Sequence, residues 1–174
     1  MESAKVRTFR KALEHWPESF AFALALCRDR DEAEDLCQEA FLRLWAMDRP
    51  VDDERPLRPL LFTIVKNQFR TRARRQRPDV FSDVEEVDGV TEETDGPLAR
   101  AERSERHALV EEALGKMNPL WRAALYLADG LGLSYAEIAE ILDRTEDVIR
   151  VTLHRARLRV RVMLKSRIEE TTES

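Results

Sequence analysis

Residues 132–157 read GLSYAEIAEILDRTEDVIRVTLHRAR, and this stretch decides the fold. Ser134, followed three residues later by Glu137, forms the pair that caps the start of a helix, and apolar residues at helical spacing continue that helix to Leu142. Thr145 then begins a second and longer helical pattern. Two helices joined by a short turn have the proportions of a helix-turn-helix, an arrangement that binds duplex DNA in many proteins.

The longer helix, predicted over residues 145–165, has an apolar side and a basic side. Its apolar side consists of Ile149, Leu153, Ala156 and Val160, and its polar side carries Arg150, His154, Arg157 and Arg161. Ala139 is small enough for the two helices to approach, and Asp143 stands in the turn, where aspartate tolerates left-handed backbone better than most residues. The basic side is suited to the major groove, although a helical hairpin with a basic surface would show the same pattern.

Helical patterns continue upstream of this pair. Leu109, Ala113 and Met117 have helical spacing, and Asn118 before Pro119 predicts the cap and first turn of a helix that runs to about residue 128. The glycine-containing residues 129–132 end that helix. The sequence therefore predicts two helices ahead of the helix-turn-helix.

Four more helical stretches precede residue 78. Phe9 and Leu13 indicate a short amphipathic helix, and Pro17 is suited to the first turn of the next one. Asp31 is predicted to cap a helix that ends near residue 47, and a final helix spans about residues 57–75. On this last helix Phe62 and Phe69 are expected in the core, and a row of basic residues is expected outside: Lys66, Arg70 and Arg74.

The charge of the chain is divided into blocks. The 174 residues carry a net charge of −5, but residues 66–77 hold six basic residues and no acidic one. Residues 78–106 hold ten acidic residues against three arginines, and residues 144–167 return to eight basic against two acidic. Two basic blocks can attract a DNA backbone even when the whole chain is acidic. The acidic block has few apolar side chains and is predicted to be a flexible linker.

Several function classes are disfavoured by the sequence. It contains no phosphate-binding loop and no metalloprotease or serine-hydrolase motif, so we expect no enzyme and no cofactor. Cys27 and Cys37 lack metal-ligand spacing and are expected to be reduced, buried thiols, with no metal site. The longest apolar run, residues 20–27, is far shorter than a bilayer requires, and no export signal is visible, so we expect a cytoplasmic protein without membrane insertion.

Four segments, in order, resemble one known family. They are DLCQEAFLRLW at residues 35–45, LLFTIVKN at 60–67, GLSYAEIAEIL at 132–142 and LHRAR at 153–157. Together they resemble the bacterial RNA polymerase sigma factors of the extracytoplasmic-function (ECF) group. The resemblance covers nearly all of residues 5–165, and the order of the motifs around an acidic segment makes it specific.

The resemblance implies roles for residues of the first domain. Four residues match positions that bind the coiled-coil clamp of the polymerase's largest subunit: Asp35, Gln38, Glu39 and Leu42. Asn67 matches a position that contacts unpaired bases of the −10 promoter element, and residues 48–56 correspond to a loop that captures a flipped base. Lys66, Arg70 and Arg74 would then hold the DNA backbone nearby.

In the second domain, the resemblance implies contacts with the −35 promoter element by Arg150, Val151, His154 and Arg155. Here the chain departs from the family pattern, because residues 143–148 replace the usual glycine, aliphatic residue, proline and small residues. Glu146 and Asp147 favour a helix N-terminus but repel nearby phosphate. We therefore expect an atypical −35 sequence or weaker duplex binding. Leu60 also stands where the family often has tryptophan.

The sequence thus predicts an all-α fold of two small helical domains joined by an acidic flexible linker, the second with a helix-turn-helix. The predicted divisions are residues 1–77, a linker at 78–106, a second domain at 107–168 and a tail at 169–174. The expected function is that of an alternative sigma factor, whose partners are core RNA polymerase, promoter DNA and an anti-sigma factor. The alternatives are a helix-turn-helix regulator that acts without core polymerase and a sigma mimic that sequesters an anti-sigma factor.

Overall fold

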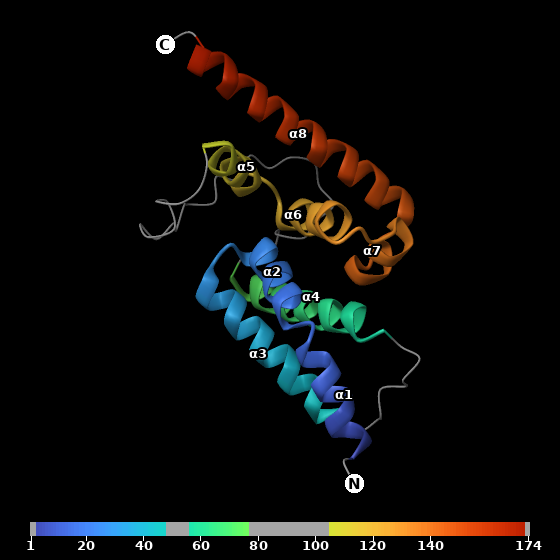
Figure 1. Cartoon of the computed structure of the whole chain (residues 1–174). Helices are drawn as coiled ribbons and strands as arrows, with labels where there is room; N and C mark the ends of the chain where they lie inside the picture. The colour runs from blue at the N-terminus through green and yellow to red at the C-terminus, as the bar shows by residue number, and fades with distance from the viewer. Residues whose placement is uncertain (1–2, 48–55, 77–104, 173–174) are drawn as a thin grey trace.

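The computed structural model describes residues 3–47, 56–76 and 105–172, and all regular structure in these ranges is helical (Figure 1). The first domain contains α1 (Ala4–Leu13), α2 (Trp16–Cys27), α3 (Arg30–Ala46) and α4 (Leu57–Gln76). The second contains α5 (Glu105–Gly115), α6 (Pro119–Leu125), a π-helical turn η2 (Tyr126–Gly130), α7 (Tyr135–Leu142) and α8 (Glu146–Thr172). The expected linker lies almost wholly outside the described residues.

Local capping explains where the helices of the first domain begin and end. Pro17 occupies the first turn of α2, as predicted, and that helix ends at Arg28 in left-handed conformation with φ 57°. The predicted cap of α3 is wrong by two residues. Asp29 is the N-cap, and its carboxylate accepts a hydrogen bond of 2.8 Å from the backbone N–H of Glu32. Asp31 lies within the first turn, where its charge favours the positive end of the helix dipole.

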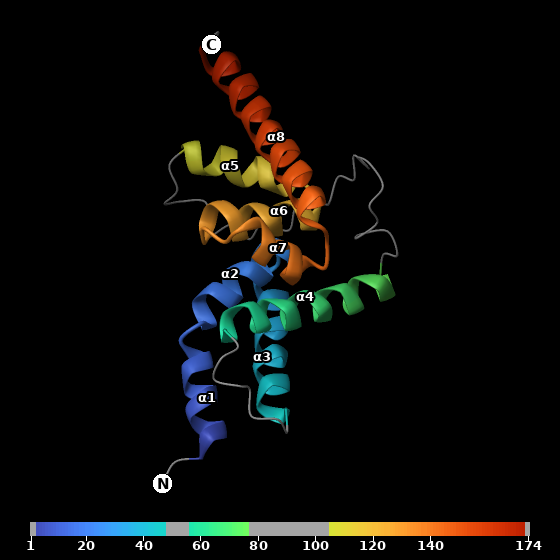
Figure 2. The same ribbon diagram turned by 90° about the vertical axis from the view of Figure 1, so that its right-hand side faces the viewer.

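The second domain follows its predicted signals closely, with three differences. Asn118 caps α6 ahead of Pro119, and Ser134 and Glu137 form the complete capping box of α7. The helix expected to run to residue 128 is α-helical only to Leu125 and finishes as the π-helical turn η2. The last helix is longer than predicted, because it reaches Thr172. Val160, expected in the core, is half-buried. The end of α8 extends away from the body of the molecule (Figures 1 and 2).

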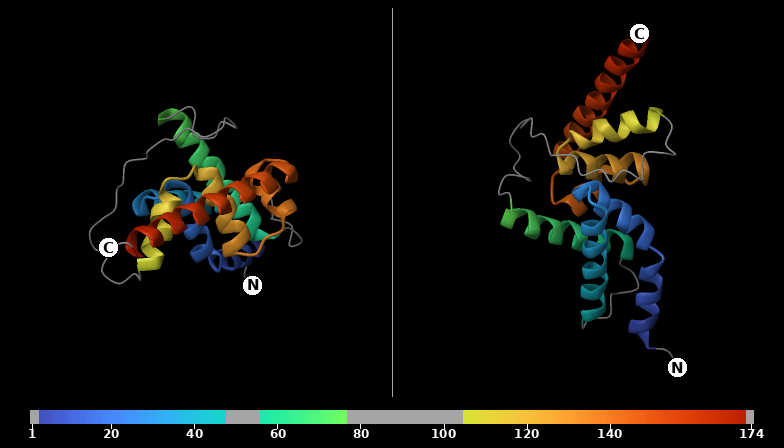
Figure 3. Two further views of the ribbon diagram at one scale, coloured as in Figure 1. Left: turned by 90° about the horizontal axis from the view of Figure 1, so that it is seen from above. Right: turned by 90° about the vertical axis from the view of Figure 1, so that its left-hand side faces the viewer.

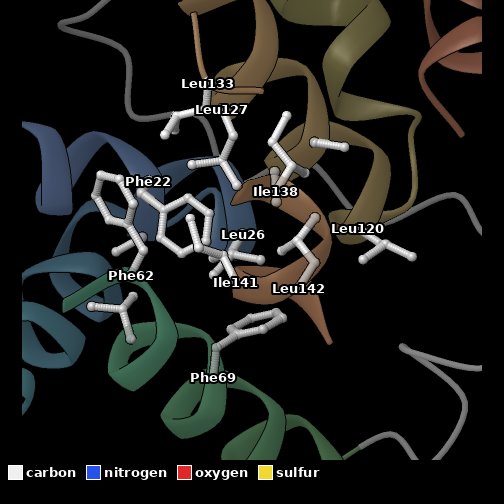
Figure 4. Packing of buried hydrophobic residues seen from close by; sticks show 14 of the residues in the cluster. Phe22, Leu26, Phe62, Phe69, Leu120, Leu127, Leu133, Ile138, Ile141 and Leu142 are labelled. Carbon is white, nitrogen blue, oxygen red and sulfur yellow. The ribbon is translucent and has the colours of Figure 1, made fainter. Parts of the chain in front are cut away.

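The two domains are packed together around one continuous apolar core. The second domain lies on the first, and α6 and α7 face α2 and α4 (Figures 2 and 3). Leu26 of α2, Phe69 of α4 and Ile141 of α7 belong to the same cluster of buried residues. Figure 4 shows Ile141 and Leu142 among side chains from both domains. Phe62 and Phe69 are buried as predicted, but part of what covers them comes from the other domain.

Polar contacts reinforce this packing at the end of α2. The buried Arg122 guanidinium on α6 donates hydrogen bonds to the carbonyls of Ala25 (2.7 Å) and Leu26 (2.9 Å). It also donates to the carbonyls of Leu114 and Met117 in its own domain. One side chain therefore joins the last turn of a helix in the first domain to two segments of the second.

The two cysteines are free thiols in the first domain. Cys37 is buried and Cys27 is partly buried, close to the prediction. Burial raises the pKa of Cys27 to about 11 and that of Cys37 to about 12. Both side chains are therefore protonated at neutral pH.

Candidate functional site

The exposed side of α3 presents acidic, amide and apolar groups together. Asp35, Gln38 and Leu42 are exposed, and Leu42 keeps 66% of its surface accessible. The opposite side of the helix is anchored by buried residues: Ala33, Leu36, Cys37, Ala40, Phe41 and Leu44. The anchoring fixes the rotation of α3, so these exposed side chains have a defined direction.

Glu39 differs from its predicted neighbours because it is tied to the first domain. Its carboxylate forms ion pairs with Arg72 of α4 at 2.9 Å and with Arg43 at 3.1 Å. The hydrogen bond from Arg72 is the main reason that its pKa lies below the usual value. Glu39 therefore holds α3 against α4 and keeps only part of its carboxylate at the surface.

Only part of the predicted basic row on α4 is exposed to solvent. Asn67 and Arg74 are exposed, and Arg70 is half-buried with a guanidinium nitrogen 4.0 Å from a carboxylate oxygen of Asp143. Lys66 is buried, with 4% of its surface accessible, which corrects the expectation that it faces solvent. Burial lowers its pKa, and the nearby cations Arg70 and Arg144 act in the same direction while Asp143 opposes them. Residues 48–55 of the predicted base-capturing loop lie outside the described residues.

The first turns of α8 carry an exposed row of side chains. Arg150, Val151, His154 and Arg155 are all exposed, and Ile149, Leu153 and Ala156 are buried on the opposite side. The structure thus brings the four predicted residues onto one surface.

Acidic groups accompany this row. Arg150 donates to the carboxylate of Asp147 at 2.7 Å, so part of its charge is offset in the unbound protein. Further along the helix, Arg157 is held by both carboxylate oxygens of Asp129, at 2.7 and 3.1 Å. These hydrogen bonds are the main reason that the Arg157 pKa is raised.

The turn between α7 and α8 has the left-handed residue that a helix-turn-helix requires. Asp143 has φ 55° and ψ 53°, and the following N–H of Arg144 bonds to the carbonyl of Ala139 at 2.9 Å. Thr145 then caps α8, because its hydroxyl accepts a hydrogen bond from the N–H of Val148. An aspartate therefore performs the role usually given to glycine in this turn.

Comparison with known families shows to which family this chain belongs. Residues 12–78 match the model of sigma-70 region 2, and residues 107–160 match that of sigma-70 region 4. The ECF RNA polymerase sigma factor EcfG of Rhodopseudomonas palustris is 34% identical over 155 residues, which cover 85% of this chain and 80% of the relative. The chain belongs to the ECF family of RNA polymerase sigma factors.

Other similarities extend over most of this sigma factor. The ECF sigma factor SigE of Mycolicibacterium smegmatis is 32% identical over 164 residues, which are 92% of this chain and 63% of that relative. A solved structure of the sigma factor RpoE of Bartonella quintana, in complex with the anti-sigma factor NepR, has a similar fold, and its sequence is 28% identical to this chain. The match has a TM-score of 0.69 and covers 90% of this chain and 95% of the RpoE chain.

Membership in the family gives this sigma factor its general function. It is an alternative sigma factor that binds core RNA polymerase and promoter DNA and directs transcription initiation. Sigma factors are non-enzymatic initiation factors. None of the helices in residues 3–47, 56–76 and 105–172 is long and apolar enough to cross a membrane.

An apolar surface near the free ends of α1 and α3 was not among the predicted site residues. Trp45 (41%) and Met47 (41%) of this sigma factor keep large accessible fractions. The Trp45 ring lies 5.1 Å from that of Phe9, and the Lys5 ammonium lies 5.0 Å from its centre. Trp45 at the end of the DLCQEAFLRLW segment is the sequence feature that could have indicated this surface.

Proposed function

We propose that the exposed side of α3 is where this sigma factor contacts core RNA polymerase. Asp35, Gln38 and Leu42 combine charge, hydrogen bonding and an accessible apolar side chain on a helix whose rotation is fixed. Glu39 contributes its remaining surface and positions α3 through Arg72. A mixture of an apolar centre with polar surroundings is typical of protein interfaces.

We assign the −10 element to α4. Asn67 is exposed and offers an amide that can read a base edge, and Arg74 is exposed two turns further along. Lys66 and Arg70 would add phosphate contacts once they are accessible. The amide group of Asn67 is the feature that supports base reading rather than charge attraction alone.

We assign the −35 element to the start of α8, where Arg150, Val151, His154 and Arg155 share one exposed surface. Val151, with 48% of its surface accessible, is suited to the methyl group of thymine. Asp147 pairs with Arg150 in the free protein, so duplex binding must break or bypass that pair. This cost supports a −35 contact weaker than one made by unpaired arginines.

The assignments also suggest a role for each domain. The proposed division is a promoter-melting domain at residues 1–77 and a duplex-binding domain at residues 107–168. The protein would act in the cytoplasm, without enzymatic activity of its own. Its proposed partners include an anti-sigma factor, because the Bartonella relative was solved in complex with one.

Run-off transcription with purified core polymerase, carried out with the wild-type protein and two variants, tests the proposal. Asn67→Ala should reduce open-complex formation and relax preference at one −10 position, at a cost of about 1–3 kcal/mol. Arg155→Ala should weaken closed-complex binding through the −35 region and reduce its salt dependence. Permanganate footprinting measures promoter melting, and gel shifts at several salt concentrations measure duplex binding.

Two substitutions on the same helices serve as controls. Gln76→Ala on α4 and Ser166→Ala on α8 alter exposed, uncharged residues outside the proposed contacts and should change neither measurement. If Asn67→Ala leaves melting intact, the −10 assignment is wrong. If the chain binds the promoter duplex fully without core polymerase, a helix-turn-helix regulator describes it better.

A further inference from the structure

Arg157 of α8 is a basic residue close to the proposed −35 surface that has no role in it so far. By helical spacing it lies two turns beyond Arg150 on the same side of α8, where a basic side chain could reach a phosphate. Its guanidinium instead pairs with Asp129, a residue of the π-helical turn η2. A charge that spacing alone would assign to DNA is therefore used inside the second domain.

The contact between Arg157 and Asp129 is bidentate. The Nε of Arg157 donates to one carboxylate oxygen at 3.1 Å, and Nη2 donates to the other at 2.7 Å. The guanidinium also hydrogen-bonds to the hydroxyl of Tyr135, the first residue of α7. A planar guanidinium that uses several donors at once has one preferred orientation. Arg157 thus joins α8 both to η2 and to the start of α7.

The backbone of η2 holds Asp129 in place. The N–H of Leu131 bonds to the carbonyl of Tyr126 at 3.0 Å, a closure one residue wider than that of an α-helix. The N–H of Leu133 then bonds to the carbonyl of Leu127 at 3.0 Å. π-helical turns are rare and occur frequently at functional sites. Asp129 therefore projects from a hydrogen-bonded turn, which gives its carboxylate a defined position.

The ion pair at the start of α8 is of a different kind. Asp147 and Arg150 belong to the same helix, three residues apart, and a contact of 2.7 Å joins them. That pair offsets charge but cannot fix α8 against another element. Arg157 and Asp129, by contrast, are 28 positions apart in the chain and lie on different elements. Their contact therefore restrains the direction of α8 relative to η2 and α7.

The direction of α8 determines how its exposed row meets DNA. In a helix-turn-helix the second helix enters the major groove while the first crosses the backbone, so the angle between them sets which side chains reach the bases. Ile149, Leu153 and Ala156 hold α8 by buried apolar contacts, which are not directional. Arg157, the residue after Ala156, adds the directional contact that such packing lacks.

We propose that Arg157 is a positioning residue for recognition of the −35 element, and that Asp129 and Tyr135 hold it in that role. Through these contacts η2 and α7 fix the angle at which α8 presents its exposed row to the duplex. Arg157 is not itself a phosphate contact. This inference rests on the proposed function, because it requires that the start of α8 reads the −35 element.

Gel shifts of the holoenzyme, formed from the full chain and core polymerase, test this role with two aspartate variants. Asp129→Asn should weaken binding to a promoter that carries the −35 element about fivefold, because the contact that orients α8 is lost. Asp147→Asn is the matched control, which removes the same charge from the same domain. It should strengthen binding about twofold, since it releases Arg150 and reduces the repulsion of phosphate. Removal of negative charge alone would make both variants bind more tightly.

Salt dependence separates a positioning role from a phosphate contact. Arg157→Gln should weaken binding about fivefold and keep the wild-type slope of log K against log salt, whereas Arg155→Ala should make that slope less steep by about 0.9. The double variant Asp129→Asn, Arg157→Gln should bind within about twofold of either single variant, because both substitutions break the same contact. Circular dichroism and affinity for core polymerase should match the wild type, since the proposed polymerase contact on α3 is untouched.

The possible results distinguish this inference from the function on which it rests. Wild-type or tighter binding by Asp129→Asn would overturn the positioning role, as would losses that multiply in the double variant. A slope for Arg157→Gln that falls as much as that of Arg155→Ala would make Arg157 a phosphate contact instead. If Arg155→Ala leaves the preference for the −35 element unchanged, the proposed function of α8 is wrong and the inference fails with it.

Discussion

Arg122 illustrates how a single buried charge can be held without a carboxylate. Its described hydrogen bonds go to main-chain carbonyls of Ala25, Leu26, Leu114 and Met117. Burial lowers its pKa to about 10, and the neighbouring Arg28 acts in the same direction. The guanidinium remains charged at neutral pH, and its planar fork can reach carbonyls on different helices at the same time.

Replacement of this residue should be costly. Arg122→Met keeps much of the side-chain volume but leaves several buried carbonyls without a donor, so the free energy of unfolding should fall by about 3 kcal/mol. The matched variant Arg157→Met removes a guanidinium that pairs with an exposed aspartate, and it should cost about 1 kcal/mol or less. Urea denaturation measures both, and equal losses would contradict the importance given to burial.

Lys66 presents the opposite case, a buried cation that we expect to destabilise the protein. Lys66→Met should raise the melting temperature by a few degrees, because the loss of a desolvated charge outweighs the loss of its attraction to Asp143, and Arg70 and Arg144 repel that charge. The folded-state pKa of Lys66 is lowered, so the unfolded chain binds more protons between that value and 10.5. Wild-type stability should therefore rise relative to Lys66→Met as pH increases through this window.

Thermal melts of both proteins at pH 7 to 10.5 check this effect, since the other titrating groups are common to the two proteins. The difference in melting temperature should shrink toward high pH. A difference that is constant with pH, or a variant that is less stable at pH 7, would show that Lys66 is not penalised by its surroundings.

Among the helical elements, the turn from α7 to α8 depends on the backbone of one residue. Asp143 adopts left-handed conformation and has an exposed side chain. Asp143→Gly and Asp143→Ala both remove the carboxylate, so they differ mainly in the cost of that conformation. The alanine variant should be about 1 kcal/mol less stable than the glycine variant. Chemical denaturation measures the difference, and equal stabilities would indicate that the turn can rearrange.

The elements that were predicted well are those with local signals. Sequence alone indicates a helix end where the capping residue bonds to groups at most four positions away. This holds for the start of α6 at Asn118 and for both ends of α7, at Ser134 and Asp143. The error at α3 arose because two aspartates, Asp29 and Asp31, both suit a helix start, and the choice depends on how α2 ends at Arg28.

At the scale of the whole molecule, the prediction of separate domains missed their contact. Ile141 and Leu142 fit the core of a helix-turn-helix by spacing, and no local signal shows that Leu26 and Phe69 lie on the other side of them. For the same reason the burial of Lys66 was missed, since its cover comes from residues more than 70 positions away. Apart from the half-buried Glu39, the predicted site residues on α3 and α8 are exposed, because their surroundings are set mainly within one domain.

The shared core predicts that the free protein unfolds as one unit. Calorimetry should show a single transition with an enthalpy of about 120 kcal/mol for the chain, and the van't Hoff value should equal the calorimetric one. Fluorescence of Trp121, the tryptophan of the second domain, should follow the same transition once Trp16 and Trp45 are replaced by phenylalanine. Two separate transitions would show that the domains are thermodynamically independent.

The bonds that Arg122 makes to the end of α2 also bear on how such chains diverge. A substitution at Leu26 in region 2 or Ile141 in region 4 alters the surface against which the other region packs. Substitutions in one region therefore limit which side chains the other can accept. Hybrids that join region 2 of this protein to region 4 of a distant relative should retain each promoter preference but lose the fit between them. Recombination between related sigma factors is therefore expected to weaken the contact between the two domains without changing the residues that read DNA.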